Sequence, residues 1–139
     1  MIISYKRKAH YHETDKMAVV HHSNYFRWME EARVYFLDKI NLPFTAMEAA
    51  NIFSPVVSFT CNYHFPVWFD DEFEIKVKAV KYTGVRVNFE YEIFNLTKNK
   101  LSATAVSEHC FTSKEGRPLS VKRANPEMHT LLENCLKEN

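Results

Sequence analysis

The sequence predicts an α+β fold in which a curved antiparallel β-sheet wraps around one long central α-helix. One segment before residue 43 has the periodicity of a helix that is buried over much of its surface. Most of the chain after residue 55 has instead the period-two pattern of β-strands. A sheet with one buried face needs a covering layer, and only this helix is long enough to provide it.

The long helix is predicted to begin at Ser23 or Asn24 and to end before Pro43. Its apolar residues recur at steps of three or four: Tyr25, Trp28, Met29, Ala32, Phe36 and Ile40. Either polar side chain at the start can accept a hydrogen bond from an unpaired amide of the first turn, and proline cannot continue a helix. About seventeen residues, at about 1.5 Å each, make a rod of about 25 Å, which crosses one small domain.

Alternating apolar and polar residues predict strands at 3–11, 56–63, 73–80, 85–93 and 100–112. Short turns join the last three of these strands, so they are expected to form an antiparallel meander. Shorter helical segments are predicted at 45–50 and 126–136.

We expect a single domain over residues 1–139, because the sequence contains no repeat, no low-complexity tract and no linker-like segment. A small sheet leaves exposed edge strands, and pairing of such edges between subunits is a common remedy. The protein is therefore expected to be a homo-oligomer, a dimer at least.

The composition is that of an ordinary folded chain, with 46% hydrophobic and 25% charged residues. Lys plus Arg (18) nearly balances Asp plus Glu (17), so no general attraction to nucleic acid or to an anionic membrane is expected. The three cysteines, Cys61, Cys110 and Cys135, have no metal-ligand spacing, and no signal peptide opens the sequence. We therefore expect reduced thiols, a cytoplasmic location and no membrane insertion.

A polar segment containing Asp15, His21 and His22 runs directly into the long helix. Taken alone, Asp15 is more often a turn residue than a catalyst, and a tandem His pair is usually an exposed pair. The amides at the helix start are unpaired within the helix and lie at the positive end of its dipole. A carboxylate next to such amides favours a catalytic interpretation.

Four short segments carry a family resemblance: YHETD at 11–15, VV at 19–20, HSNY at 22–25 and EEAR at 30–33. In order and spacing they resemble the N-terminal signature of the hotdog-fold acyl-CoA thioesterases of the 4-hydroxybenzoyl-CoA thioesterase type. The branch that looks most similar is that of the Tol-Pal-associated thioesterase, in which a His follows an Asp by seven residues, as His22 follows Asp15. One departure is Ala18, where such proteins commonly have Gly in the turn that lines the site.

The resemblance implies the hotdog fold and hydrolysis of acyl-CoA or acyl-carrier-protein thioesters. It implies no metal and no cofactor other than the coenzyme A of the substrate. It also implies a homodimer or homotetramer. In this chemistry Asp15 acts as general base or as nucleophile, two roles that the sequence does not distinguish. The backbone N–H of His22 is implied to polarise the thioester carbonyl, and its side chain is a second catalytic candidate.

The residues expected to bind substrate flank this catalytic pair or line an apolar pocket: Tyr11, Val20, Ser23, Asn24, Tyr25, Phe59 and Tyr63, with Phe53 and Phe65 as further pocket candidates. Coenzyme A carries phosphates, so basic residues near turns are candidates for holding it: Lys81, Arg86, Lys122 and Arg123.

Two other functions compete with hydrolysis. One is a non-catalytic acyl-thioester binding or scaffold protein, which the presence of Asp15 disfavours. The other is a hydratase or dehydratase of acyl thioesters, which we expect to carry its His in a different context near the central helix. His10 and His12 are predicted to share one face of the first strand and to be structural, with metal binding a remote option.

Overall fold

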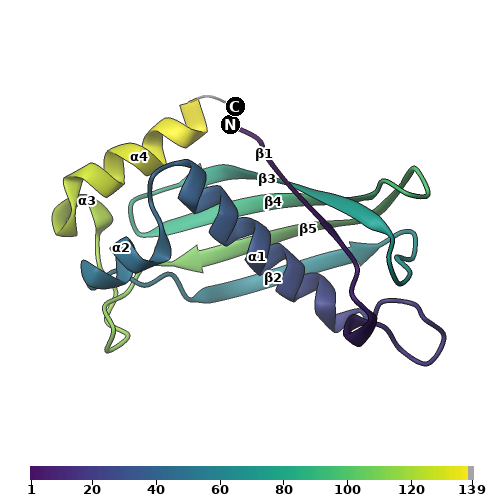
Figure 1. Cartoon of the computed structure of the whole chain (residues 1–139). Coiled ribbons are helices and arrows are strands. Elements are labelled where there is room, and N and C mark those ends of the chain that lie inside the picture. The colour runs from purple at the N-terminus through teal and green to yellow at the C-terminus, as the bar shows by residue number, and fades with distance from the viewer. Residues whose placement is uncertain (138–139) are drawn as a thin grey trace.

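Five antiparallel strands in the order β1-β3-β4-β5-β2 and one long helix, α1, form most of the protein. The computed structural model describes residues 1–137 of the chain. The strands are β1 (Ile3–Lys8), β2 (Val56–Tyr63), β3 (Glu72–Tyr82), β4 (Arg86–Asn95) and β5 (Lys100–Cys110). The helices are η1 (Tyr11–Glu13, a 3₁₀ turn), α1 (Ser23–Lys39), α2 (Phe44–Ala49), α3 (Val121–Ala124) and α4 (Pro126–Lys137). Figure 1 shows α1 lying across one face of the sheet, with α3 and α4 near one end of it.

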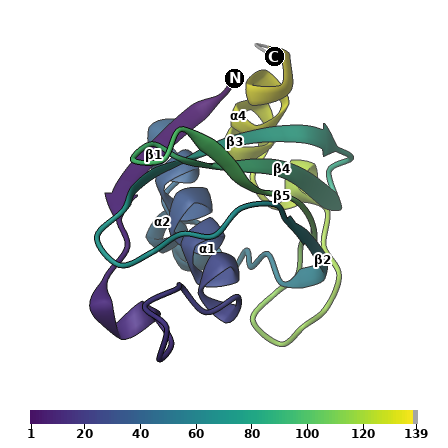
Figure 2. The ribbon, with the colours of Figure 1, turned by 90° about the vertical axis from the view of Figure 1, so that its right-hand side faces the viewer.

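The core lies between α1 and the concave face of the sheet. Seen nearly end-on in Figure 2, β3, β4, β5 and β2 curve around α1. Trp28 is fully buried and stacks on Phe73 at 4.0 Å between ring centroids, while Phe36 meets Phe89 edge-to-face at 5.5 Å. Buried and accessible residues alternate along β3 and β4, as the sequence pattern predicts. The predicted architecture is confirmed.

The curvature has a local cause. Register shifts interrupt the pairing of β3 with β4 between Ala79 and Lys81, and of β4 with β5 between Ile93 and Phe94. An extra residue in one strand of a pair increases the local twist and bends the sheet. The antiparallel meander also places successive connections at alternate ends of the sheet. The segments 64–71 and 96–99 therefore lie at the end where the chain passes from β1 into α1.

The boundary of the first strand differs from the prediction. β1 ends at Lys8, and the chain then turns into η1, because the backbone N–H of His10 donates to the Glu13 carboxylate at 2.7 Å. His10 and His12 consequently do not share a strand face, although their ring centroids lie 5.5 Å apart. The short helix α3 was not predicted either.

A chain of polar side chains crosses the core beneath α1. Arg33 Nη1 lies 3.5 Å from the Tyr91 hydroxyl, Tyr91 lies 2.7 Å from Ser107 Oγ, and Ser107 lies 2.8 Å from His109 Nε2. His109 Nδ1 lies 3.3 Å from the Ser54 carbonyl oxygen. One arrangement satisfies every link: each group donates to the next, and a neutral His109 donates its Nδ1–H to Ser54.

The buried His109 in this row of polar side chains is expected to make the stability of the protein pH-dependent. Burial, reinforced by the positive charge of Arg33, lowers the pKa of His109 from 6.5 to about 4. The unfolded chain therefore binds a proton on this imidazole below about pH 6.5, whereas the folded protein does not until about pH 4. We expect a free energy of unfolding that is constant above pH 6.5 and falls by up to about 3 kcal/mol toward pH 4. Urea titrations across this range measure it.

His109→Gln serves as the control, because it removes the titrating group and should flatten the dependence. The carboxyl groups of Glu13 and Asp71 have lowered pKa values, so their contribution is lost only at still lower pH, below their ordinary values of 4.5 and 3.8. A flat profile for the wild type between pH 6.5 and 4.5 would contradict the prediction.

None of the helices in residues 1–137 has the length and apolar character that crossing a membrane requires.

Candidate active site

Asp15 opens a tight hairpin between η1 and α1. Its backbone N–H donates to the Val19 carbonyl at 2.8 Å, and the Ala18 N–H donates to the Asp15 carbonyl at 3.1 Å. Oδ1 of the Asp15 carboxylate accepts a hydrogen bond from the Met17 N–H at 2.8 Å. In residues 1–137 no donor reaches Oδ2. One carboxylate oxygen therefore fixes the turn, and the other is available.

Ala18 occupies the left-handed region of backbone space, with φ 62°. A three-residue hairpin loop with a left-handed last position usually has Gly there, which explains why the family commonly carries one. Ala costs about 1 kcal/mol more than Gly in this conformation. The hairpin is nevertheless closed, because the Phe69 N–H donates to the Ala18 carbonyl at 3.0 Å. The turn therefore forms with Ala at this position.

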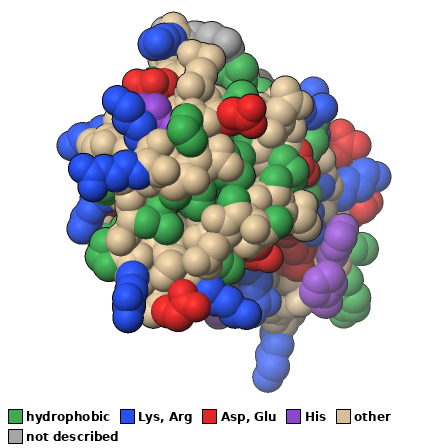
Figure 3. All heavy atoms as spheres, turned by 90° about the vertical axis from the view of Figure 1, so that its left-hand side faces the viewer, with side chains coloured by type: hydrophobic (Ala, Val, Ile, Leu, Met, Phe, Trp, Pro, Cys, Tyr) green, Lys and Arg blue, Asp and Glu red, His purple; other side chains and the backbone are tan. Residues whose placement is uncertain are grey.

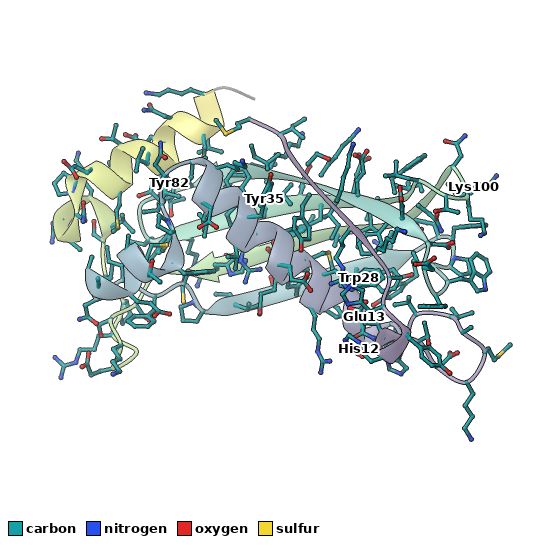
Figure 4. The ribbon with its side chains drawn as sticks, viewed as in Figure 1. His12, Glu13, Trp28, Tyr35, Tyr82 and Lys100 are labelled. Carbon is teal, nitrogen blue, oxygen red and sulfur yellow. The ribbon has the colours of Figure 1, made fainter. Side chains whose placement is uncertain are left out.

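Glu13 anchors the segment just before Asp15. Its buried carboxylate accepts hydrogen bonds from Arg7 Nη2 at 2.6 Å, from the His10 N–H at 2.7 Å and from Trp28 Nε1 at 2.7 Å. Burial alone would raise the pKa of Glu13, but these hydrogen bonds and the Arg7 charge lower it. Figure 4 shows Glu13 and Trp28 together at the N-terminal end of α1. Glu13 was not predicted as a site residue, because its role depends on hydrogen bonds from Arg7 of β1 and Trp28 of α1 that no sequence pattern reveals.

The start of α1 differs from the prediction, since neither Ser23 nor Asn24 caps it with a side chain. Instead, the Ser23 N–H donates to His21 Nδ1 at 3.2 Å, and the Asn24 side-chain amide donates to the Glu13 carbonyl at 2.7 Å. The His21 and His22 rings face each other at 4.2 Å between centroids rather than pointing apart.

The backbone N–H of His22 has no hydrogen-bond partner in residues 1–137. Its neighbours are paired, because the His21 N–H donates to the Glu13 carbonyl at 3.0 Å and the Asn24 N–H donates to the His21 carbonyl at 3.0 Å. An unpaired amide at the positive end of a helix can donate to an oxygen that develops negative charge.

A cleft of about 400 Å³ brings the carboxylate and this helix start together. Of the predicted residues, it is lined by Asp15, Val20, His22, Tyr25 and Tyr63. The Tyr63 hydroxyl donates to the His22 carbonyl at 3.2 Å, and its ring meets Tyr25 edge-to-face at 4.9 Å. Burial raises the pKa of both phenols to about 12, so they stay neutral. They shape the cleft without adding charge.

Four of the predicted substrate residues lie outside this cleft. Tyr11 lies in a neighbouring hollow beyond Asp15, with its ring 5.4 Å from Phe69. The Ser23 hydroxyl lies 2.8 Å from His21 Nδ1, and Asn24 is buried. Phe59 lines a second cleft further along α1. Of the further pocket candidates, Phe65 lines the first cleft, whereas Phe53 pairs with Thr112 at the far end of β2 and β5.

One wall of the cleft is formed by residues 64–66 after β2, of which only Phe65 was expected from the sequence to line a pocket. Backbone pairing holds this wall in place, because the Val20 N–H donates to the Val67 carbonyl at 2.8 Å and Val19 bridges to Trp68. His64 Nε2 lies 3.2 Å from Thr104 Oγ1. The sequence signals at this wall are the aromatic Phe65 and Pro66, which follows the strand.

The basic residues expected to hold coenzyme A lie near the end of the sheet opposite the cleft. Arg86 pairs with Cys110 across β4 and β5, at the end opposite the one where Tyr63 pairs with Ala103, and its guanidinium is bound to Glu108 at 2.6 Å. Lys81 ends β3 on that side, and α3 carries Lys122 and Arg123. Figure 3 shows basic side chains around this face of the molecule. The structure does not bring them to the cleft.

The side chains of His10, His12 and Glu13 each have an atom that could coordinate a metal ion, and these atoms lie within 4.8 Å of one another. The Glu13 carboxylate, however, is already hydrogen-bonded through both oxygens and pairs with the Arg7 guanidinium at 2.6 Å. A guanidinium at this distance opposes a metal cation, so this donor set does not fit a metal centre.

A curved antiparallel sheet around one central helix is the hotdog fold. At the start of that helix, Asp15 and His22 line one cleft.

The comparisons with known proteins agree. Residues 9–131 match the thioesterase-like superfamily, and the chain belongs to it. YneP of Bacillus subtilis (strain 168), which bears a provisional acyl-CoA thioesterase name, is 31% identical over 128 residues, covering 91% of this chain and 92% of its own. The acyl-CoA thioester hydrolase YbgC of Escherichia coli O157:H7 is 25% identical over 117 residues, covering 84% and 87%. A solved structure of a DHNA-CoA thioesterase from Staphylococcus aureus superimposes with a TM-score of 0.90 at 30% identity, covering 96% and 89%.

Proposed function

We propose that this protein hydrolyses acyl-CoA thioesters to a free carboxylic acid and coenzyme A. The observation that carries the proposal is the cleft lined by both Asp15, with one free carboxylate oxygen, and His22, with its unpaired backbone N–H. Membership of the thioesterase-like superfamily and the acyl-CoA substrates in the names of the relatives support it. An acyl group on a carrier protein presents the same thioester and is the alternative substrate.

In this proposal the thioester carbonyl oxygen accepts a hydrogen bond from the His22 N–H. The free Oδ2 of Asp15 then either removes a proton from water that attacks the carbonyl carbon, or attacks that carbon itself to give a mixed anhydride. In both routes the negative charge of the tetrahedral intermediate develops on the oxygen beside the helix N-terminus. The carbon–sulfur bond then breaks. In the general-base route the leaving thiolate takes the proton that Asp15 removed from water. In the nucleophilic route it takes a proton from the exposed His22 imidazole or from solvent, and a water molecule then hydrolyses the mixed anhydride, which releases the carboxylic acid and regenerates the Asp15 carboxylate.

The proposed enzyme is a homodimer, or a homotetramer of two such dimers, joined through β2. The outer edge of β2 pairs with no other strand of residues 1–137, and Val56, Val57 and Tyr63 are 52%, 45% and 46% exposed. An apolar, unpaired strand edge is a surface that association would cover. Light scattering on the eluting protein distinguishes the two assemblies.

Thiol release from a panel of acyl-CoA substrates tests the proposed function. The panel contains short, medium and long fatty acyl groups and aromatic acyl groups, and a blank without substrate corrects for the protein's own thiols. We expect turnover that peaks at one acyl class. A folded protein that releases no thiol from any acyl-CoA, nor from an acyl-carrier-protein substrate, would overturn the proposal in favour of acyl-thioester binding without catalysis.

A further inference from the structure

Arg33 is a buried cation with no anion. Arg33 is only 6% exposed, yet its guanidinium forms no ion pair with a carboxylate of residues 1–137. Nε has no hydrogen-bond partner among residues 1–137, and Nη1 makes one long contact of 3.5 Å to the Tyr91 hydroxyl. Removing a charge from water without a partner is costly, so such a group is rare unless something else pairs with it.

The polar chain beneath Arg33 does not supply that partner. Tyr91, Ser107 and His109 are neutral groups whose donors all point away from Arg33, toward the Ser54 carbonyl. Burial raises the pKa of Tyr91, so its hydroxyl does not become a phenolate near neutral pH. The positive charge of Arg33 is therefore uncompensated on the side of the sheet.

On its other side Arg33 lines a second cleft, of about 170 Å³, between α1 and β2. The other residues of this cleft are Phe26, Arg27, Glu30, Val56 and Phe59. Two arginines against one glutamate give this lining a net positive charge. Phe26 and Phe59 meet edge-to-face at 5.0 Å between ring centroids and give it apolar walls.

Both clefts are lined by residues of α1 and of β2. The first cleft contains Tyr25 of α1 and Tyr63 of β2, and the second contains Phe26 of α1 and Phe59 of β2. Along α1, His22 of the first cleft is followed by Phe26 and Arg33 of the second. A group that extends from the His22 amide between α1 and β2, toward the C-terminal end of α1, therefore runs in the direction of the Phe26–Phe59 pair and Arg33.

We propose that Arg33 binds an anionic group at the far end of the acyl chain, so that the preferred substrates are ω-carboxylated acyl thioesters rather than plain fatty acyl thioesters. This inference rests on the proposed function and names the substrate class of the same site.

The geometry sets the chain length. Arg33 lies eleven residues after His22, about 16 Å along the helix axis. A helical Arg side chain leans toward the N-terminus by about one turn, which leaves about 11 Å to span. An extended chain advances about 1.2 Å per bond, so a dicarboxylic acyl group of about eight carbons reaches the guanidinium.

The test compares octanoyl-CoA with octanedioyl-CoA, which differ only in the terminal carboxylate. In the wild type we expect a kcat/KM about 10- to 100-fold higher for octanedioyl-CoA, the range given by a hydrogen bond to a charged group. Arg33→Gln should remove this preference, and Arg33→Lys should keep part of it. Arg117→Gln should leave the ratio unchanged, because Arg117 is an exposed arginine that lines neither cleft. Circular dichroism checks that each variant is folded.

Two results overturn the inference. One is a wild type that hydrolyses octanoyl-CoA as well as or better than octanedioyl-CoA, a measurement that needs no variant. The other is an Arg33→Gln protein that loses its oligomeric state while its substrate ratio stays the same, which would assign the missing carboxylate to a second copy of the chain.

Failure of the proposed function is recognised separately. A wild type that releases thiol from neither compound, from no other acyl-CoA of the panel and from no acyl-carrier-protein substrate fails as a thioesterase. The inference is then judged from equilibrium dissociation constants of the two acyl-CoA compounds, measured by titration calorimetry on wild type and Arg33→Gln. Tighter binding of octanedioyl-CoA that depends on Arg33 supports it, and equal binding overturns it.

Discussion

Asp15→Asn is expected to lower kcat for acyl-CoA hydrolysis by about 10²- to 10⁴-fold while leaving the fold intact. The amide neither accepts a proton at neutral pH nor attacks a thioester carbon. It keeps an Oδ1 that accepts the hydrogen bond now made by the Met17 N–H at 2.8 Å, so the turn survives. The measurement is thiol release with the best acyl-CoA of the panel, beside thermal unfolding of both proteins.

The outcome distinguishes a catalytic from a structural Asp15. If the residue only shaped the turn, the isosteric Asn would retain activity within a few-fold, and that result would contradict the assignment. Lys16→Gln provides the matched control, because Lys16 neighbours Asp15 in the same exposed hairpin and has no part in the proposed chemistry.

Glu13→Gln is expected to lower the free energy of unfolding by about 3 to 5 kcal/mol. This is the largest effect on stability among our predictions. The Glu13 carboxylate is an acceptor at both oxygens, toward Arg7, His10 and Trp28. A Gln side chain turns one of those positions into a donor, so a buried N–H is left facing another donor and Arg7 loses a partner. Urea or thermal unfolding at pH 7 measures the loss.

Glu31→Gln is the matched control, because Glu31 binds the same arginine, with distances of 2.8 Å from Arg7 Nη1 to both carboxylate oxygens. Its side chain is 40% exposed, so water replaces what is lost. We expect a decrease of less than about 1 kcal/mol. Equal losses in the two variants would show that Glu13 has no special role in holding the loop.

The regular elements could be predicted from the sequence because their patterns are local. The strand at 56–63 was predicted with the bounds of β2, and the long helix was predicted within a few residues of α1. Periodicity reports burial on one face, which is all that these elements need. The end of β1 was wrong by three residues, because the turn there depends on the Glu13 carboxylate and not on an alternating pattern.

The site was predictable only in part. Asp15 and His22 do line one cleft, and the sequence placed them correctly relative to the helix start. Asn24 was assigned to substrate because its partner, the Glu13 carbonyl, is a backbone group that no sequence pattern reveals.

The misplaced basic residues have a simpler cause. Proximity to a turn does not say at which end of a sheet the turn lies, whereas the alternation of ends in an antiparallel meander does. Counting strands from Tyr63 would have placed Lys81 and Arg86 away from the cleft.

The hairpin from Asp15 to Val19 has a consequence for how relatives of this chain can diverge. The hydrogen bonds that close it involve backbone groups and the Asp15 carboxylate, and none involves the side chain of residue 16 or 17. The Met17 side chain is also largely in solvent, with 80% of the residue exposed. Mutation can change these two positions without removing the hydrogen bonds that hold the Asp15 carboxylate. A loop of this kind allows related proteins to differ in the side chains at positions 16 and 17 while they keep the Asp15 carboxylate in the same place.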